Sequence, residues 1–208
     1  MTTDAPAPAA ALLALAAKQE ITEVLFRYCR GCDRADEEAL RACFHPGSVH
    51  AHGGYEGPSA DFIDFALQIV RPLKSSTHMV TNVMIELAGD QAVSECHFLA
   101  HHRRVKPDGA GLDGAEEEDR FLKGRYLDRF ERRDGAWKIV SRTGLHDFER
   151  VLEPADQTLA SAPAHQLGRK KPDDPIYGML AGLGRLNAGA NARANTDKMV
   201  DGRAGPRR

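Results

Sequence analysis

The 208-residue sequence lacks the features that mark several large classes of protein. It has no apolar run near the ~18 residues that a membrane-spanning helix needs. Its formal net charge is only -2, which gives no electrostatic reason to bind nucleic acid or an anionic membrane. Its four cysteines show no disulfide framework, and it has no glycine-rich phosphate loop or serine nucleophile elbow. We therefore expect a cytoplasmic protein that binds neither nucleic acid nor a membrane.

The apolar stretch at residues 7–17 lacks the positive start of a secretion signal. No Lys or Arg precedes it, whereas Asp4 does, and it merges into a charged amphipathic helix. A signal peptide needs both a positive start and a distinct end. We expect residues 1–11 to be a flexible N-terminus instead.

The first third of the sequence has helical periodicity. Apolar residues recur at helical spacing between charged ones, and these are Ile21, Val24, Leu25, Tyr28 and Cys32. They predict an amphipathic helix that ends near residues 31–33. Asp36 can cap a short second helix, which His-Pro-Gly at residues 45–47 breaks. A short strand is expected at residues 48–52, and a third helix starts at Ser59.

From residue 77 the periodicity changes from helical to extended. Residues 77–87 and 91–105 are rich in Val, Ile, Met and Phe and are joined as a hairpin by an Ala-Gly-Asp turn. Residues 121–132 and 137–143 form a second hairpin around Arg-Asp-Gly. Helices first and a meander of strands afterwards are typical of an α+β layer fold. We predict one curved antiparallel sheet covered by the N-terminal helices.

The composition changes after residue 153, where Pro, Ala, Gly and Asn accumulate. Residues 154–186 are expected to be a C-terminal extension, and residues 174–186 have enough apolar side chains to serve as a lid or a dimer contact. Residues 187–208 have almost no large apolar residue and predict a disordered tail. We expect the chain to assemble as a homodimer or a homotrimer.

Asp33 and His78 are the first candidates for chemistry. Asp33 ends an apolar helical face, and His78 begins a strand whose composition predicts burial. A carboxylate beside an imidazole fixes its tautomer and stabilises the imidazolium, which makes the histidine a competent general base. Alternatively, Asp33 starts the Asp-Arg-Ala-Asp turn and His78 is an ordinary strand-end histidine. The residue types alone leave both interpretations open, because base and orienter must meet in space.

Histidines cluster on the strand predicted at residues 91–105. His97 and His101 project to one side of it, and His102 projects to the other. If the first side faces a pocket, His101 is a second acid or base or a substrate ligand. Otherwise His101 belongs to the solvated end of the strand, which is the interpretation we favour for His102.

A metal site is not expected. His50 and His52 lie on one side of a short strand, and His97 with His101 could add ligands as in a cupin. No Glu or third His follows at a recognisable interval, and the helical first third does not suit a cupin.

Three segments carry a resemblance to a known family. Residues 21–44 resemble the opening of SnoaL-like domains, where a helix ends in Tyr/Leu-x-x-x-x-Asp before an Asp-x-x-x-Leu-x-x-x-Phe helix. Residues 77–82 are similar to the His-x-x-x-Asn strand start, and residues 130–139 match the final hairpin. Residues 12–153 are therefore identified as a SnoaL-like domain of the NTF2-like superfamily. This membership implies a cone-shaped α+β barrel with N-terminal helices packed on a curved antiparallel sheet.

The resemblance is to the group of scytalone dehydratase, bile-acid 7α-dehydratase and hexachlorocyclohexane dehydrochlorinase. It implies a cofactor-independent lyase or isomerase in which His78 and Asp33 form a proton-abstracting dyad. The implied substrate is a small apolar cyclic carbonyl compound such as a steroid, polyketide or aromatic. The alternative is a non-catalytic ligand-binding or assembly module of the same fold, because this fold serves many activities.

The resemblance also suggests residues that contact the substrate. Tyr28 matches a site tyrosine five residues before the aspartate, although an ideal helix turns through about 140° over that interval. Tyr55 is a second candidate for polarising a carbonyl. Arg142 and His146 lie near the position of an arginine on the last strand of the bile-acid enzyme.

Overall fold

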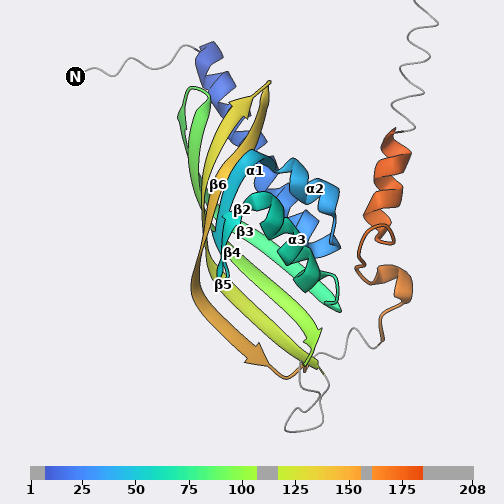
Figure 1. The fold of residues 1–208 in the computed structure, drawn as a ribbon. Helices are drawn as coiled ribbons and strands as arrows, with labels where there is room; N and C mark the ends of the chain where they lie inside the picture. The colour runs from blue at the N-terminus through green and yellow to red at the C-terminus, as the bar shows by residue number, and fades with distance from the viewer. Residues whose placement is uncertain (1–7, 107–116, 156–160, 185–208) are drawn as a thin grey trace, which may run out of the picture. The chain divides into compact units, whose positions relative to one another are not determined.

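Among the residues that the computed structural model describes (8–106, 117–155 and 161–184), three helices and six strands make up the larger of two units, which spans residues 1–161 (Figure 1). The helices are α1 (Pro8–Arg34), α2 (Glu37–Ala42) and α3 (Ser59–Val70). The strands are β1 (Phe44–His52), β2 (Tyr55–Pro58), β3 (Ser75–Ala88), β4 (Gln91–Val105), β5 (Glu117–Arg133) and β6 (Ala136–Leu152). The predicted α+β class is confirmed.

The corner between α1 and α2 is encoded locally. The Asp36 carboxylate accepts a hydrogen bond from the backbone N–H of Ala39 at 3.1 Å, which is the predicted cap of α2. The two helices approach closely, because a Cβ added at Gly31 would lie 2.8 Å from the Leu40 side chain. α1 begins earlier than predicted, at Pro8, since its first turns are built from Ala and Leu, which are strong helix formers.

The strands form one open sheet in the order β2-β1-β6-β5-β4-β3. β1 runs parallel to β6, and every other neighbouring pair is antiparallel. The sheet is therefore mixed rather than wholly antiparallel, and it does not close into a barrel. β6 is also longer than predicted, because it pairs with β5 along its whole length as far as Asp119 opposite Leu152.

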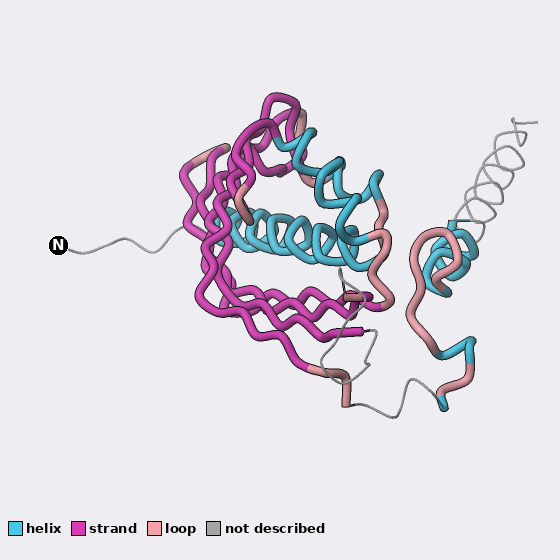
Figure 2. The backbone as a smooth tube through the Cα atoms, turned by 60° about the horizontal axis from the view of Figure 1, so that its bottom comes forward, coloured by secondary structure: helices cyan, strands magenta, loops and turns pink. Residues whose placement is uncertain are grey.

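The sheet curves around α1 (Figure 2). Irregularities in strand pairing, which increase local twist, occur between Thr81 and Met84 on β3 and between Lys123 and Gly124 on β5. Gly124 is required at its position, since a Cβ there would lie 1.9 Å from the Leu145 carbonyl oxygen. The curvature leaves a concave face that receives α1 and α3.

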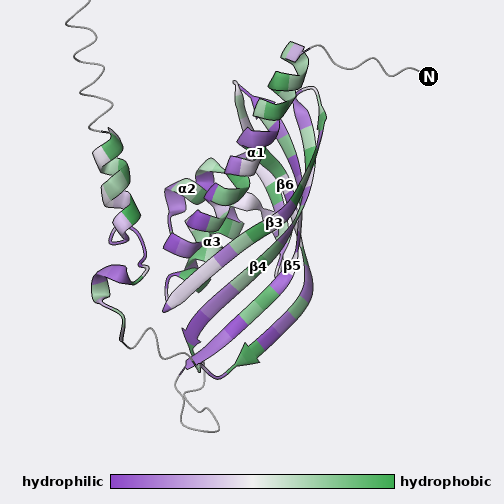
Figure 3. Cartoon of the chain, turned by 180° about the vertical axis from the view of Figure 1, so that it is seen from behind, coloured by the Kyte–Doolittle hydropathy of each residue, from purple (hydrophilic) through white to green (hydrophobic). Residues whose placement is uncertain are grey.

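The core lies between the helices and this concave face. Buried and more exposed positions alternate along residues 91–100 of β4 and 124–130 of β5, so each strand buries one side. Hydrophobic and hydrophilic residues are interspersed on both strands (Figure 3). Fully buried side chains include Ile21, Leu25, Leu67, Phe130 and Ile139. In the described ranges, no helix is both long and apolar enough to cross a membrane.

The second unit, residues 162–184 as described, contains a helix over residues 175–184. Asp174 precedes it and accepts hydrogen bonds from the backbone N–H groups of Arg169 and Ile176. A role as lid or dimer contact stays a prediction, as do the domain boundaries predicted at residues 153 and 186. The predicted disordered tail and most of the predicted flexible N-terminus lie outside the described residues.

Gly124→Ala should destabilise the larger unit by about 2–3 kcal/mol, because a methyl group there overlaps the backbone of β6. Urea unfolding followed by circular dichroism would measure the change. Gly178→Ala is the control, since nothing lies within 4 Å of a Cβ at that position. Equal stabilities for the Gly124 variant and the wild type would contradict the steric argument.

Candidate active site

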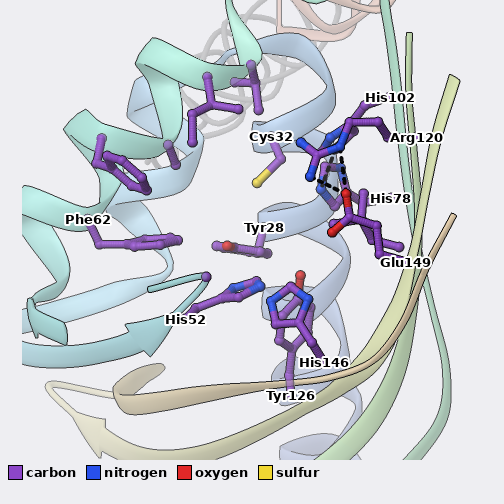
Figure 4. Close-up of a pocket in the computed structure, with 16 residues that line it drawn as sticks. Tyr28, Cys32, His52, Phe62, His78, His102, Arg120, Tyr126, His146 and Glu149 are labelled. Atoms are coloured by element: carbon purple, nitrogen blue, oxygen red, sulfur yellow. Dashed lines mark hydrogen bonds and ion pairs between the residues drawn. The ribbon is translucent and has the colours of Figure 1, made fainter. Parts of the chain in front are cut away.

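A cavity of about 430 Å³ opens between the helices and the concave face of the sheet (Figure 4). Its volume lies in the range of pockets that bind small organic ligands. Helices α1 and α3 provide mostly apolar walls, which include Cys32, Phe62 and Val70. Strands β1, β3, β4, β5 and β6 provide the polar groups, and these are His52, His78, His102, Arg120, Tyr126, His146 and Glu149.

Asp33 and His78 are in contact. The His78 Nδ1 atom lies 2.7 Å from Asp33 Oδ1, and the His78 backbone N–H donates to Asp33 Oδ2 at 3.0 Å. Ser76 Oγ donates to the same carboxylate at 3.1 Å. Because a carboxylate can only accept, Nδ1 carries the proton and Nε2 is left as an acceptor. A base oriented in this way is able to remove a proton from a bound compound.

Asp33 contacts His78 from outside the cavity. Tyr28, Cys32 and His78 line the cavity, whereas Asp33 lines a separate surface groove between α1 and β3 with Phe26. Tyr28 and Asp33 therefore do not need to share a helix face, because His78 lines both the cavity and the groove in which Asp33 lies. The distortion of the helix end that a shared face would require is absent, since α1 continues to Arg34.

A second imidazole stands beside His78. His102 Nε2 lies 3.4 Å from His78 Nε2, at the outer limit of a hydrogen bond, and both rings line the cavity. Arg120 and Glu149 form an ion pair at the same end of the cavity (Figure 4). This end therefore combines two histidines with a pair of opposite charges.

Arg142 does not line the cavity. Its side chain is fully buried and bonds to both carboxylate oxygens of Asp128, at 2.7 and 2.8 Å. Its guanidinium carbon lies 4.2 Å from the ring centroids of both Tyr28 and Tyr126, whose planes are nearly perpendicular, so the cation contacts two aromatic rings at the corner between them. Burial opposes this charge, but the Asp128 carboxylate raises the pKa of Arg142 well above its ordinary value.

Two residues expected to contact the substrate lie elsewhere. His101 is on the opposite face of the sheet, where its Nε2 lies 2.8 Å from Asp119 Oδ1, because the side of β4 that carries Phe98 faces inward. Tyr55 is absent from the cavity wall, and its hydroxyl donates to the Pro58 carbonyl at 2.9 Å. Both expectations are corrected.

Tyr28 and His146 line the cavity as expected. Burial raises the pKa of Tyr28 well above its ordinary value, so the hydroxyl keeps its proton.

Five polar residues of the cavity wall were not predicted as site residues, namely His52, His102, Arg120, Tyr126 and Glu149. A signal for His102 was present in the sequence, because the side of β4 that carries it is more apolar than the side that carries His101. His52 and Tyr126 carried no local signal, since long-range strand pairing brings them to the cavity.

Two buried histidines of β1 are neutral. Burial lowers the pKa of His50 from 6.5 to about 2 and that of His52 to about 3, and the nearby Arg142 acts in the same direction. His50 is almost completely inaccessible, and its ring stacks on Phe62 at a centroid distance of 3.5 Å. Among the described residues, neither nitrogen of His50 has a hydrogen-bond partner.

A family model described as a SnoaL-like domain matches residues 14–143. A type 2 hexachlorocyclohexane dehydrochlorinase has a similar structure, with 22% identity and a TM-score of 0.59 over 74% of this chain and 97% of that chain. A scytalone dehydratase-like protein from Novosphingobium aromaticivorans has 20% identity and a TM-score of 0.56 over 69% and 91%. The Kfla4162 protein from Kribbella flavida has 18% identity and a TM-score of 0.57 over 66% and 95%. At such identities these structures show the fold alone, and a comparison with curated proteins finds no match.

His50→Leu should make the protein less sensitive to acid. Below pH 6.5 the unfolded chain protonates His50, whereas the folded chain keeps it neutral to about pH 2, so stability falls as the pH falls through this window. Between pH 6.5 and pH 5 the loss from one such histidine is up to about 2 kcal/mol.

Urea unfolding of wild type and His50→Leu at pH 7.5 and pH 5 would measure the difference. His101→Leu, on the outer face of the sheet, is the control and should lose as much stability on acidification as wild type. The same loss in all three proteins would mean that His50 is not kept neutral by the fold.

Proposed function

The chain belongs to the SnoaL-like domain family, and from this premise and the Asp33–His78 geometry we propose that it is a cofactor-independent lyase or isomerase. The proposed substrate is a small apolar cyclic carbonyl compound, such as a steroid, polyketide or aromatic. The observation that carries the proposal is the 2.7 Å contact between His78 Nδ1 and Asp33 Oδ1, behind an imidazole that faces an apolar cavity.

The reaction starts with removal of a proton beside the carbonyl group. His78 Nε2 takes the proton from the carbon, and the electrons of the C–H bond move to the carbonyl to give an enolate. The Asp33 carboxylate stabilises the imidazolium that forms and holds the ring in place. General base catalysis of this kind contributes about 10²–10⁴-fold to a rate.

The enolate oxygen needs a hydrogen-bond donor in a site with little water. Tyr28 lines the cavity with His78 and keeps its proton, because burial raises its pKa. We assign Tyr28 this role, in which a donor placed where charge develops lowers the barrier.

Departure of a leaving group completes a dehydration. In a β-hydroxy ketone the enolate electrons form the C=C bond as the β C–O bond breaks, and the departing hydroxide takes a proton to become water. His102, 3.4 Å from His78, is the proton donor that replaces His101 in this role, and His146 also lines the cavity. In an isomerisation the same proton returns to a different carbon, and no group leaves.

His78→Ala should abolish exchange of the protons beside a carbonyl group. We expect wild type in D₂O to incorporate deuterium next to the carbonyl of 1-tetralone or a saturated steroid 3-ketone, measured by mass spectrometry. His78→Ala should lower the rate by about 10²–10⁴-fold, and Asp33→Asn should lower it by a smaller factor because Nε2 remains.

His101→Ala is the matched control and should exchange at the wild-type rate, since its ring lies on the other face of the sheet. Tight binding of the ketones with exchange that does not depend on His78 would favour the non-catalytic ligand-binding or assembly module. The homodimer or homotrimer stays a prediction.

A further inference from the structure

The cavity has a second polar region, away from His78. His52 of β1 and His146 of β6 both line it, and their ring centroids are 4.9 Å apart. Figure 4 shows these rings below Tyr28, whereas His78 and His102 lie beside the Arg120–Glu149 ion pair. In the proposed proton-transfer steps His52 has no role, and no step is assigned to His146.

The position of the His52 ring is fixed by its surroundings. A Cβ added at Gly144 would lie 2.6 Å from His52 Cγ, so the ring occupies the space that only a glycine leaves free. On its other sides the ring is stacked near Phe62, at a centroid distance of 5.9 Å, and edge-on to Tyr126 at 5.5 Å. A side chain held this firmly presents its polar atoms at a fixed point.

Several buried nitrogen atoms near this region have no hydrogen-bond partner among the described residues. They are both ring nitrogens of His50, the Nδ1 atom of His52 and the Nη1 atom of Arg142. His50 and Arg142 lie opposite each other on the paired strands β1 and β6. Of these three residues only His52 lines the cavity, and its Nε2 atom is not among the buried atoms without a partner, so Nε2 is the atom that can meet a ligand.

His52 is suited to recognising a neutral group. Burial lowers its pKa to about 3, and its interactions with His146 and then with Arg142 act in the same direction. A neutral imidazole offers one donor and one acceptor, which matches a hydroxyl group and can also serve a carbonyl oxygen. Within the described ranges, no set of three or more His, Cys, Asp or Glu side chains is arranged to hold a metal ion.

We propose that His52 and His146 form a hydrogen-bonding subsite for an uncharged oxygen substituent, at the end of the substrate remote from the carbon that His78 attacks. This inference rests on the proposed function, because it assumes that the substrate of that reaction binds in the same cavity. It narrows the substrate class to ring compounds with two oxygen functions, one at the reacting carbonyl and one across the ring system. Compounds that lack the second oxygen leave the subsite unsatisfied and bind less tightly.

The test compares two ligands that differ by one oxygen, 6-hydroxy-1-tetralone and 1-tetralone, by isothermal titration calorimetry. Wild type should bind the hydroxylated ketone at least about 10-fold more tightly, because only that ketone gives the imidazoles of the subsite a hydrogen-bond partner. Equal affinities in wild type would overturn the proposal without any variant.

Variants show which residues cause the preference for the hydroxylated ketone. His52→Leu should remove the preference for the hydroxyl compound. In this variant 1-tetralone no longer leaves the polar group of residue 52 unpaired, so it should bind at least as tightly as it does to wild type. His52→Gln should keep part of the preference, because an amide also donates and accepts. His146→Leu should weaken the preference. His101→Leu, on the outer face, should retain it in full. A preference that survives in both His52→Leu and His146→Leu would contradict the subsite.

Gly144→Ala tests independently whether the position of the His52 ring matters. It should reduce the preference in wild type by displacing His52, and should have no further effect on the preference in a His52→Leu background. Circular dichroism and thermal unfolding of each variant would establish that it is folded. Additive effects of the two substitutions would show that Gly144 acts by another route and would count against the proposal.

Failure of this inference and failure of the proposed function are distinguishable. Binding selectivity is measured in the His78→Gln variant as well, where the base is missing. A hydroxyl preference with no deuterium exchange in wild type would leave the subsite standing and remove the lyase or isomerase. Deuterium exchange that depends on His78, without any hydroxyl preference, would support the lyase or isomerase and remove the subsite.

Discussion

The ion pair between Arg142 and Asp128 is the interaction on which the site depends most. Both side chains are fully buried, and the guanidinium contacts the rings of Tyr28 and Tyr126. Removing one partner of a buried pair commonly costs about 3–5 kcal/mol, because the other charge is left without compensation. The pair joins β6 to β5, and the contact of Arg142 with Tyr28 connects both strands to α1. Tyr28 and Tyr126, the two tyrosines that Arg142 contacts, are part of the cavity wall.

Burial and the same buried cation act together on two histidines of β1. Burial is the main reason that the pKa values of His50 and His52 are lowered, and the positive charge of Arg142 acts in the same direction. Only His52 of these two lines the cavity, whereas His78, elsewhere in the cavity wall, has the Asp33 carboxylate at 2.7 Å. The cavity therefore holds one imidazole that burial keeps neutral and another beside a carboxylate that would stabilise its protonated form.

Local patterns predicted the helices and the hairpins, because caps and periodicity act over a few residues. The contact between Asp33 and His78, which are 45 residues apart, was implied only by the family resemblance. Pairings between distant segments were not predictable in this way. The parallel pairing of β1 with β6 brings His50 opposite Arg142. No local pattern in either strand predicts this pairing. His101 and His102 show the limit most clearly, since alternation separates them but only the packing of β4 decides which one faces inward.

The location of Asp33 bears on what the cavity is for. A cavity that only stores an apolar compound needs no carboxylate, and a carboxylate meant to bind the compound would line the cavity itself. Asp33 is outside the cavity wall, and its oxygens accept hydrogen bonds from the Ser76 hydroxyl and from the backbone N–H and Nδ1 of His78. Its negative charge would stabilise the protonated form of the His78 imidazole, which does line the cavity. The proposed proton transfer depends on this arrangement.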